Sequence, residues 1–425
     1  MLLNKRFSNG ILNPSFILRG ISSGVKFLFV LYLASFASGM VVGQYALVAT
    51  ITAIIVQLIG FDVTTIVGRL IHKTDRAGKF KLLESQYSFY VINYIIFFSL
   101  IVFLFVKFVS SDYLLAILFG FTIVVEHFFT EVFRTLVSLV KVKSATIIQF
   151  LKSVPYIIVI MLSSFFYNVE ISIYFIIISW FVNLLFVSFF FFFKYRNELN
   201  LSFKFLFDNT TYVGTKRLLY SAIPYFSITV LGVLFSQVDK FFINDYLGHE
   251  LLGVYFTFFT ICSVLTLFIS LTVGINQGPV AIRIFSQSGI SKYLPARKRL
   301  ISSYFKYITL GFIVSFIVGS LYIYMSNNQI YSENYLSFYI LLLSTAILAF
   351  GQVFRVDLYL LEKDKVLFLI YLSSLLFNLA LLYITLPLYG VLGASITSLI
   401  STSVMVLAKI IQSRKYLKLV ALNEC

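Results

Sequence analysis

The 425-residue sequence is poor in charge, in cysteine and in histidine. Asp, Glu, Lys and Arg together make up 12% of it, and only two cysteines and three histidines occur. Cys262 lies inside an apolar run and Cys425 is the last residue, so neither a disulfide framework nor a zinc site is indicated. No G-x-x-x-x-G-K-[ST] motif occurs, which argues against ATP binding by a P-loop. We therefore expect no metal and no cofactor.

What the sequence has instead is apolar residues, which make up 60% of the chain and give a mean hydropathy of +0.96. A helix that crosses a bilayer needs about 20 such residues in a row. Twelve runs of this kind follow one another, near 17–38, 41–71, 87–109, 113–140, 146–167, 171–193, 218–243, 251–282, 303–325, 335–361, 367–386 and 391–411. The sequence therefore predicts an all-α polytopic membrane protein with about 12 transmembrane helices.

The positive charges alternate between successive connections. Lys and Arg are frequent before the first run and in every second connection after it, and 25 of the 33 lie in these segments and the C-terminal tail. The other connections, 39–40, 110–112, 168–170, 244–250, 326–334 and 387–390, contain none. Cytoplasmic loops carry such an excess, so both termini are expected in the cytoplasm, and the net charge of +16 indicates topology. Without a basic soluble domain we expect no nucleic-acid partner.

The N-terminus has some features of a signal peptide. Lys5 and Arg6 precede an apolar stretch, and small residues follow at ASFASG (34–39). Cleavage there would leave eleven runs, so we expect the segment to be retained as the first span.

Two stretches of the sequence correspond to each other. GQYALVATITAI (43–54) and GVYFTFFTICSV (253–264) both open the second span of a six-span block, and a long basic connection, 194–217, lies midway between the blocks. Both blocks enter the membrane from the cytoplasm, which is the pattern of a parallel repeat in transporters. We expect an N-terminal six-helix lobe at 1–200 and a C-terminal six-helix lobe at 201–425.

Four stretches of the sequence carry a resemblance to a known family: DKFFINDYLGHELLGVY (239–255), YLASFASGMVVGQYAL (32–47), SAIPY (221–225) and GVLGASITSLIS (390–401). In these stretches the chain resembles, at family level, the Wzx-type flippases of bacterial polysaccharide biosynthesis. These flippases belong to the multidrug/oligosaccharidyl-lipid/polysaccharide (MOP) exporter superfamily. The resemblance implies a V-shaped two-lobe fold that works by alternating access in the bacterial inner membrane. It also implies that undecaprenyl-pyrophosphate-linked oligosaccharide, an O-antigen or capsule repeat unit, moves from the cytoplasmic to the periplasmic leaflet. A polysaccharide polymerase and a chain-length regulator are the partners it implies.

Ionisable residues inside the spans are costly in a bilayer and are the candidates for function. Arg19 and Lys26 are seven residues apart in the first span and form one basic stripe, in which Lys26 is too deep for simple snorkelling. Asp62 and Arg69 have the same spacing in the second span. Asp62 needs a partner, whereas Arg69 is as readily an interfacial anchor as a ligand.

The fourth span is the richest in charge, with the sequence EHFFTEVFR at 126–134. His127, Glu131 and Arg134 share one helical face, and Glu126 points elsewhere. A glutamate with a histidine one turn away suits proton exchange during transport. A Glu131–Arg134 pair that locks the lobe explains the same residues.

The second half carries fewer such charges. Arg283 ends the eighth span, and Arg355 and Asp357 lie in the cytoplasmic third of the tenth, on different faces. The charged stretch 236–255 is interpreted mainly as a solvated external turn, with a gate at the outer mouth as the alternative.

These charges lead to two groups of candidates. For a pyrophosphate or glycan we expect basic residues: Arg19, Lys26, Arg69, Arg134, Arg283 and Arg355. For ion coupling we expect Asp62, Glu126, His127 and Glu131. The alternative function is an ion-coupled drug or metabolite exporter of the same superfamily. A glycan polymerase or ligase is disfavoured because the longest external connection is the short 326–334, so no enzyme is expected.

Overall fold

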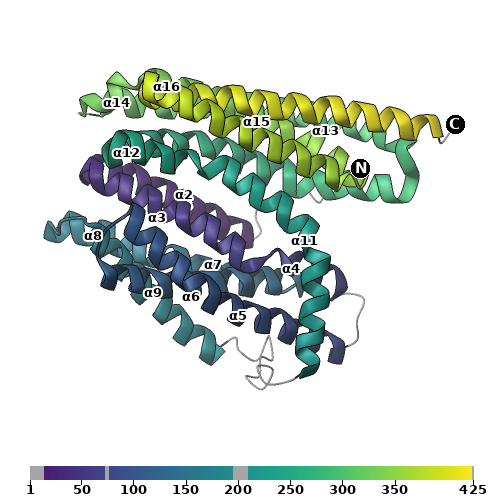
Figure 1. The fold of residues 1–425 in the computed structure, drawn as a ribbon, viewed down its shortest axis with the longest axis horizontal. Coiled ribbons are helices and arrows are strands. Elements are labelled where there is room, and N and C mark those ends of the chain that lie inside the picture. The colour runs from purple at the N-terminus through teal and green to yellow at the C-terminus, as the bar shows by residue number, and fades with distance from the viewer. Residues whose placement is uncertain (1–13, 72–75, 195–208, 327, 424–425) are drawn as a thin grey trace. The chain divides into compact units, whose positions relative to one another are not determined.

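The computed structural model describes residues 14–71, 76–194, 209–326 and 328–423, and all the regular structure in these ranges is helical (Figure 1). The chain divides into two compact units, Met1–Val230 and Leu231–Cys425. The lobe boundary expected at 200/201 lies outside the described residues. The all-α polytopic fold predicted from the apolar runs is confirmed.

The first unit is built around one central helix. Its helices are α2 (Pro14–Phe36), α3 (Gly39–Gly60), α4 (Val63–Leu70), α5 (Arg76–Phe108), α6 (Tyr113–Ser138), α7 (Val142–Ser153), α8 (Pro155–Tyr167), α9 (Ile173–Lys194) and α11 (Asn209–Gln237). Helix α6 packs against α3, α4, α5, α7 and α9. Helix α11 contains Pro224 and continues past Val230 into the second unit.

The second unit contains longer helical segments. These are α12 (Asp239–Ile269), the π-turn η2 (Ser270–Gly274), α13 (Ile275–Met325), α14 (Gln329–Glu333), α15 (Tyr335–Leu360) and α16 (Asp364–Asn423). Helix α15 packs against α12, α13 and α16 and is the central helix here, as α6 is in the first unit.

Three of these long helical segments reverse direction at a glycine. Gly248, Gly289 and Gly390 have φ angles of 82°, 70° and 56°. Across Gly390, the hydroxyl oxygens of Thr385, before the glycine, and Thr397, after it, are 2.6 Å apart. Residues 12 apart in a straight helix would lie about 18 Å apart. The chain therefore folds back, and α16 supplies two antiparallel segments.

Ten helical runs in the described ranges are long and apolar enough to cross a membrane. Two of them, Leu218–Gly274 and Asp364–Val420, have 57 residues each and are divided by Gly248 and Gly390. Dividing them gives twelve segments at the predicted places. The chain is thus a multi-pass membrane protein.

The interpretation of 236–255 as a solvated turn is wrong for its first charges. Lys240 is fully buried and Asp239 is 8% exposed. The reversal occurs at Gly248, so Asp239 still lies within the helical hairpin and Tyr255 returns beside it, donating to Asp239 Oδ2 over 2.5 Å. Only the residues around the glycine match the expectation, since Asp245 and Glu250 are exposed.

The reversal at Gly390 gives a direct test of the helical hairpin. A Cβ at Gly393 would lie 2.2 Å from the Thr385 carbonyl oxygen, so the backbone must shift to accept it. We expect Gly393→Ala to destabilise the detergent-solubilised protein by about 1–3 kcal/mol, measured by thermal unfolding. Gly24→Ala is the matched control, because its Cβ meets nothing within 4 Å. Equal stability of the two variants would contradict the close approach.

Candidate functional site

The second membrane span is broken at a strained corner between α3 and α4. Phe61 and Asp62 both adopt left-handed backbone angles, with φ of 49° and 53°. For residues other than glycine such angles cost about 1–3 kcal/mol each and persist only when the surroundings hold them. Helix α11 supplies part of that support. Phe226 stacks on Phe61 with ring centroids 3.7 Å apart, and Thr229 donates to Asp62 Oδ2 over 3.0 Å.

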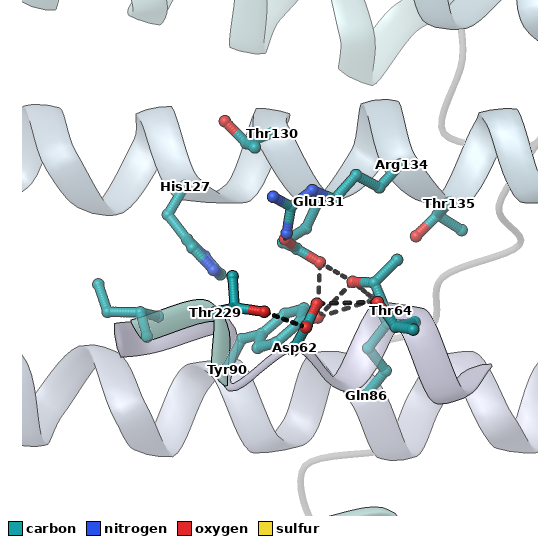
Figure 2. A network of polar contacts seen from close by, with 12 residues as sticks. Asp62, Thr64, Gln86, Tyr90, His127, Thr130, Glu131, Arg134, Thr135 and Thr229 are labelled. Atoms are coloured by element: carbon teal, nitrogen blue, oxygen red, sulfur yellow. Dashed lines mark hydrogen bonds and ion pairs between the residues drawn. The ribbon is translucent and has the colours of Figure 1, made fainter. Parts of the chain in front are cut away.

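Beside this corner lies a buried carboxylate with several hydrogen-bond donors (Figure 2). Glu131 on α6 is fully buried. Its Oε1 accepts from Arg134 Nη1 over 2.9 Å, and its Oε2 accepts from Tyr90 over 2.6 Å and from Thr64. Gln86 donates to the hydroxyls of Tyr90 and Thr64. Three helices, α4, α5 and α6, therefore converge on one charge.

His127 lies one turn from Glu131 on α6 and is also fully buried. Its Nδ1 is 2.9 Å from the Tyr94 hydroxyl, whereas its Nε2 has no hydrogen-bond partner. A Cβ built on Gly60 would lie 3.2 Å from that nitrogen and 3.5 Å from Glu131 Oε1. The unpartnered nitrogen and the carboxylate therefore both face the last residue of α3, next to the strained corner.

A second buried ion pair holds the opposite side of α6. Lys152 on α7 is 3% exposed and donates from Nζ to Glu126 Oε1 over 2.6 Å and to Thr130 Oγ1 over 2.7 Å. Glu126 thus points away from the Glu131 network. The ion pair with Lys152 gives Glu126 a structural role. This role does not depend on ion coupling.

The basic candidates of the first unit differ in their surroundings. Arg134 is paired with Glu131, and its side chain is 36% exposed. The guanidinium of Arg19 lies 5.2 Å from the centre of the Phe133 ring, and its Nε has no hydrogen-bond partner. Lys26 is exposed and interacts electrostatically with Glu126 and Lys152. The side chain of Arg69 lies outside the described residues.

The second unit has its own buried carboxylate on its central helix. Asp357 on α15 is fully buried and accepts from Tyr293, from Arg297 Nε over 2.8 Å and from Ser413. Arg283 and Arg355 are both exposed. The structure therefore keeps Arg355 apart from Asp357, as their positions on different faces predict.

Several residues of these networks were missed by sequence reasoning. Lys152 stands in an apolar run, three residues before Pro155. A lysine in this position inside a span is a signal that could have identified Lys152 as a candidate. Arg297 lies in a basic connection whose charge was attributed to topology alone. The polar partners Thr64, Gln86 and Tyr90 carry no charge, so no pattern in the sequence distinguished them.

The described residues contain no group of three or more His, Cys, Asp or Glu side chains placed to hold a metal ion. In the first unit, the carboxylate of Glu131 and the imidazole of His127 can instead bind protons and form hydrogen bonds.

Comparisons with known proteins identify the fold. No family model and no curated protein sequence matches the chain. Among solved structures, the lipid II flippase MurJ in an inward closed conformation superposes with a TM-score of 0.70 at 13% identity, covering 96% of this chain and 90% of that one. An outward-facing MATE family multidrug resistance transporter of the MOP superfamily gives 0.59 at 13% identity, covering 95% and 94%. A MATE structure in complex with MaL6 gives 0.61 at 14% identity, covering 95% and 94%.

These likenesses extend over nearly the whole chain, so the fold is that of the MOP-type transporters. The expectation of a MOP-type membrane fold is confirmed at this level.

The buried pair Lys152–Glu126 provides a test of the first unit. Removing one partner of a buried pair leaves an uncompensated charge, so we expect Lys152→Met to destabilise the protein by about 3–5 kcal/mol. The double variant Lys152→Met with Glu126→Gln removes both charges and should recover most of that loss, measured by thermal unfolding. If the double variant is no more stable than the single one, the charge pairing is not what Lys152 contributes.

Proposed function

We propose that the protein is a Wzx-type flippase. It moves undecaprenyl-pyrophosphate-linked oligosaccharide, an O-antigen or capsule repeat unit, from the cytoplasmic to the periplasmic leaflet of the bacterial inner membrane by alternating access. Both termini lie in the cytoplasm, and a polysaccharide polymerase and a chain-length regulator act on the product. The likeness of fold to a lipid II flippase supports a lipid-linked substrate.

The observation that carries the proposal is the distribution of paired and unpaired charge in the first unit. The intramembrane acids Glu126 and Glu131 each have a basic partner. Arg19 and Lys26, on α2, form no ion pair in the described part of the chain, although a cation in a span is costly. An anionic substrate group supplies the missing partner, and a pyrophosphate offers many acceptor oxygens for arginine and lysine.

Arg134 contributes to the same function in a second way. Its side chain is partly exposed while one nitrogen holds Glu131, which leaves other guanidinium donors for substrate oxygens. Arg69, Arg283 and Arg355 remain candidates for contacts with the pyrophosphate or the glycan.

The alternative is an ion-coupled drug or metabolite exporter. MATE transporters share the fold, and one of the structures is that of a multidrug resistance protein. Such an exporter with cationic substrates would need unpaired acids. Glu126 and Glu131 are instead paired, which favours the flippase. Asp62 accepts hydrogen bonds from the hydroxyls of Thr65 and Thr229 and forms no ion pair in the described residues, so it is the acid of the first unit that suits an exporter.

The flippase proposal predicts where the lipid-linked glycan accumulates. In native cells that lack the gene, the glycan should be trapped on the cytoplasmic leaflet, detected with a membrane-impermeant sugar-modifying probe on right-side-out and inverted vesicles. Re-expression of the wild-type gene should restore transfer, and the variant Arg19→Gln with Lys26→Gln should not. Lys107→Gln, an exposed lysine at the other end of the first unit's bundle, is the control and should transfer normally.

Two results would contradict the proposal. A normal leaflet distribution in cells without the gene, with no redundant gene present, would favour the exporter. Full transfer by the Arg19 and Lys26 variant, at wild-type protein levels, would remove these residues from substrate binding.

Proton coupling through His127 and Glu131 is a separate part of the proposal. The charged and titratable groups around them are Tyr90 and Tyr94 from α5, Arg134 from α6 and, through space, Lys152 from α7. His127 Nε2 and Glu131 Oε1, the two atoms that would take up the proton, both face Gly60, the residue before the Phe61–Asp62 corner, and Oε1 would have to release Arg134 to do so. Asp62 binds no proton in this scheme but links the corner to α11.

Coupling of this kind predicts a change in the pH dependence of transport. In inverted vesicles with an imposed proton gradient, we expect wild-type transfer to respond to the gradient. His127→Asn should still fold, because asparagine preserves a hydrogen bond to Tyr94. Its response to the proton gradient should fall about tenfold or more. Tyr94→Phe is the control that removes only the bond at Nδ1. An unchanged response in His127→Asn would exclude the histidine from coupling.

A further inference from the structure

One lysine of the second unit has no acidic partner. Four ion pairs involve buried side chains of the described residues: Glu126–Lys152, Glu131–Arg134, Asp239–Lys240 and Asp357–Arg297. Lys409 on α16 is fully buried, yet no Asp or Glu in the described ranges forms an ion pair with it. A buried ammonium without a counter-charge is costly and calls for an explanation.

The neighbour of Lys409 is a phenol. Its Nζ donates to the Tyr371 hydroxyl over 3.1 Å and lies 4.3 Å from the centre of the same ring. A tyrosine hydroxyl that accepts from an ammonium keeps its own hydrogen for donation to another group. Tyr371 is 6% exposed, and its ring also lies close to Gly232 of α11, where an added Cβ would meet it at 3.6 Å.

A second cation lies in the same region. Arg355 on α15 is exposed and interacts electrostatically with both Lys409 and Tyr371. The guanidinium and the ammonium repel each other. The nearby carboxylate of Asp357 does not relieve this repulsion, because Arg297, Tyr293 and Ser413 already bind it.

We propose that Arg355, Tyr371 and Lys409 form an oxyanion-binding site of the second unit, which takes a phosphate or pyrophosphate group. Arg355 meets the anion from the exposed side by paired hydrogen bonds. Tyr371 donates its hydroxyl hydrogen to a ligand oxygen. Lys409 acts behind Tyr371 as a positioning residue, holding the hydroxyl and supplying the charge that the anion neutralises.

The inference rests on the proposed function for its biological meaning, because the headgroup of an undecaprenyl-pyrophosphate-linked substrate is such an oxyanion. Binding can nevertheless be measured without transport, so the two proposals fail separately. The site adds Tyr371 and Lys409 to the basic residues expected from the sequence.

The test uses the full-length protein in phosphatidylcholine nanodiscs with inorganic pyrophosphate as the probe. We expect pyrophosphate to raise the Tm of the wild-type protein in a concentration-dependent way, as any ligand of the folded state does. The variants are compared in an Arg19→Gln, Lys26→Gln background, which removes the binding that the proposed function assigns to the first unit. There, Arg355→Gln and Lys409→Met should each weaken the apparent affinity about 10- to 100-fold, as expected for the loss of a charged hydrogen bond. Tyr371→Phe should weaken it as well. Lys365→Gln, an exposed lysine at the start of α16, is the matched control and should bind like the wild type.

A structural role of Lys409 is separated by the Tm without ligand. If Lys409 serves the anion, Lys409→Met should keep or raise that Tm, because methionine removes an unpaired buried charge. A lowered Tm together with wild-type affinity for pyrophosphate would overturn the proposal. Loss of affinity in Arg19→Gln with Lys26→Gln, but not in Arg355→Gln or Lys409→Met, would also overturn it and place the anion in the first unit.

The source of the phosphate group is assigned by a second arm. Nanodiscs that contain phosphatidylglycerol are compared with the phosphatidylcholine ones. Competition by phosphatidylglycerol, lost in Arg355→Gln, supports occupation by a lipid headgroup. Tight pyrophosphate binding that phosphatidylglycerol does not affect supports a diphosphate-selective site.

Discussion

The rest of the structure depends on the cost of placing charge among apolar side chains. With 12% charged residues, the chain has few charges to place, and four ion pairs of the described residues hold most of its buried ones, with Lys409 as an exception. Two of the four ion pairs join different helices, Lys152 of α7 with Glu126 of α6 and Arg297 of α13 with Asp357 of α15. The other two, Glu131–Arg134 and Asp239–Lys240, lie within one helix each. The two interhelical pairs fix the register between their helices, because sliding one helix along the other would leave Glu126 or Asp357 without its cation.

The two units use the same plan at their centres. Helices α6 and α15 are the fourth spans of their respective blocks, and each packs against three or more other helices of its unit. Each carries one fully buried acid, Glu131 or Asp357, which accepts hydrogen bonds from a tyrosine, an arginine and a hydroxyl side chain. The environments differ in one respect. Glu131 lies beside a buried histidine with an unpartnered nitrogen, and this feature makes the first unit the candidate for proton chemistry.

The sequence predicted the spans well because a bilayer-crossing run is a long signal that tolerates errors of a few residues. It predicted the shared face of His127, Glu131 and Arg134 because these residues lie on one helix, whose period is known. Contacts between helices were harder. Nothing in the local sequence shows that Lys152 reaches Glu126, that Tyr255 returns to Asp239 across Gly248, or that Lys409 is buried. The left-handed Phe61 and Asp62 gave no signal either, since neither is a glycine.

Helix α11 belongs to both compact units, and Pro224 lies in it shortly before the division at Val230. Proline has no backbone N–H, so one hydrogen bond of the helix is missing, and its ring crowds the preceding turn. A helix that lacks one hydrogen bond bends most easily at that point. Helix α11 therefore bends most easily near Pro224, close to Phe226 and Thr229, whose contacts hold the Phe61–Asp62 corner. The stiffness with which α11 supports the left-handed backbone of Phe61 and Asp62 thus depends on this single proline.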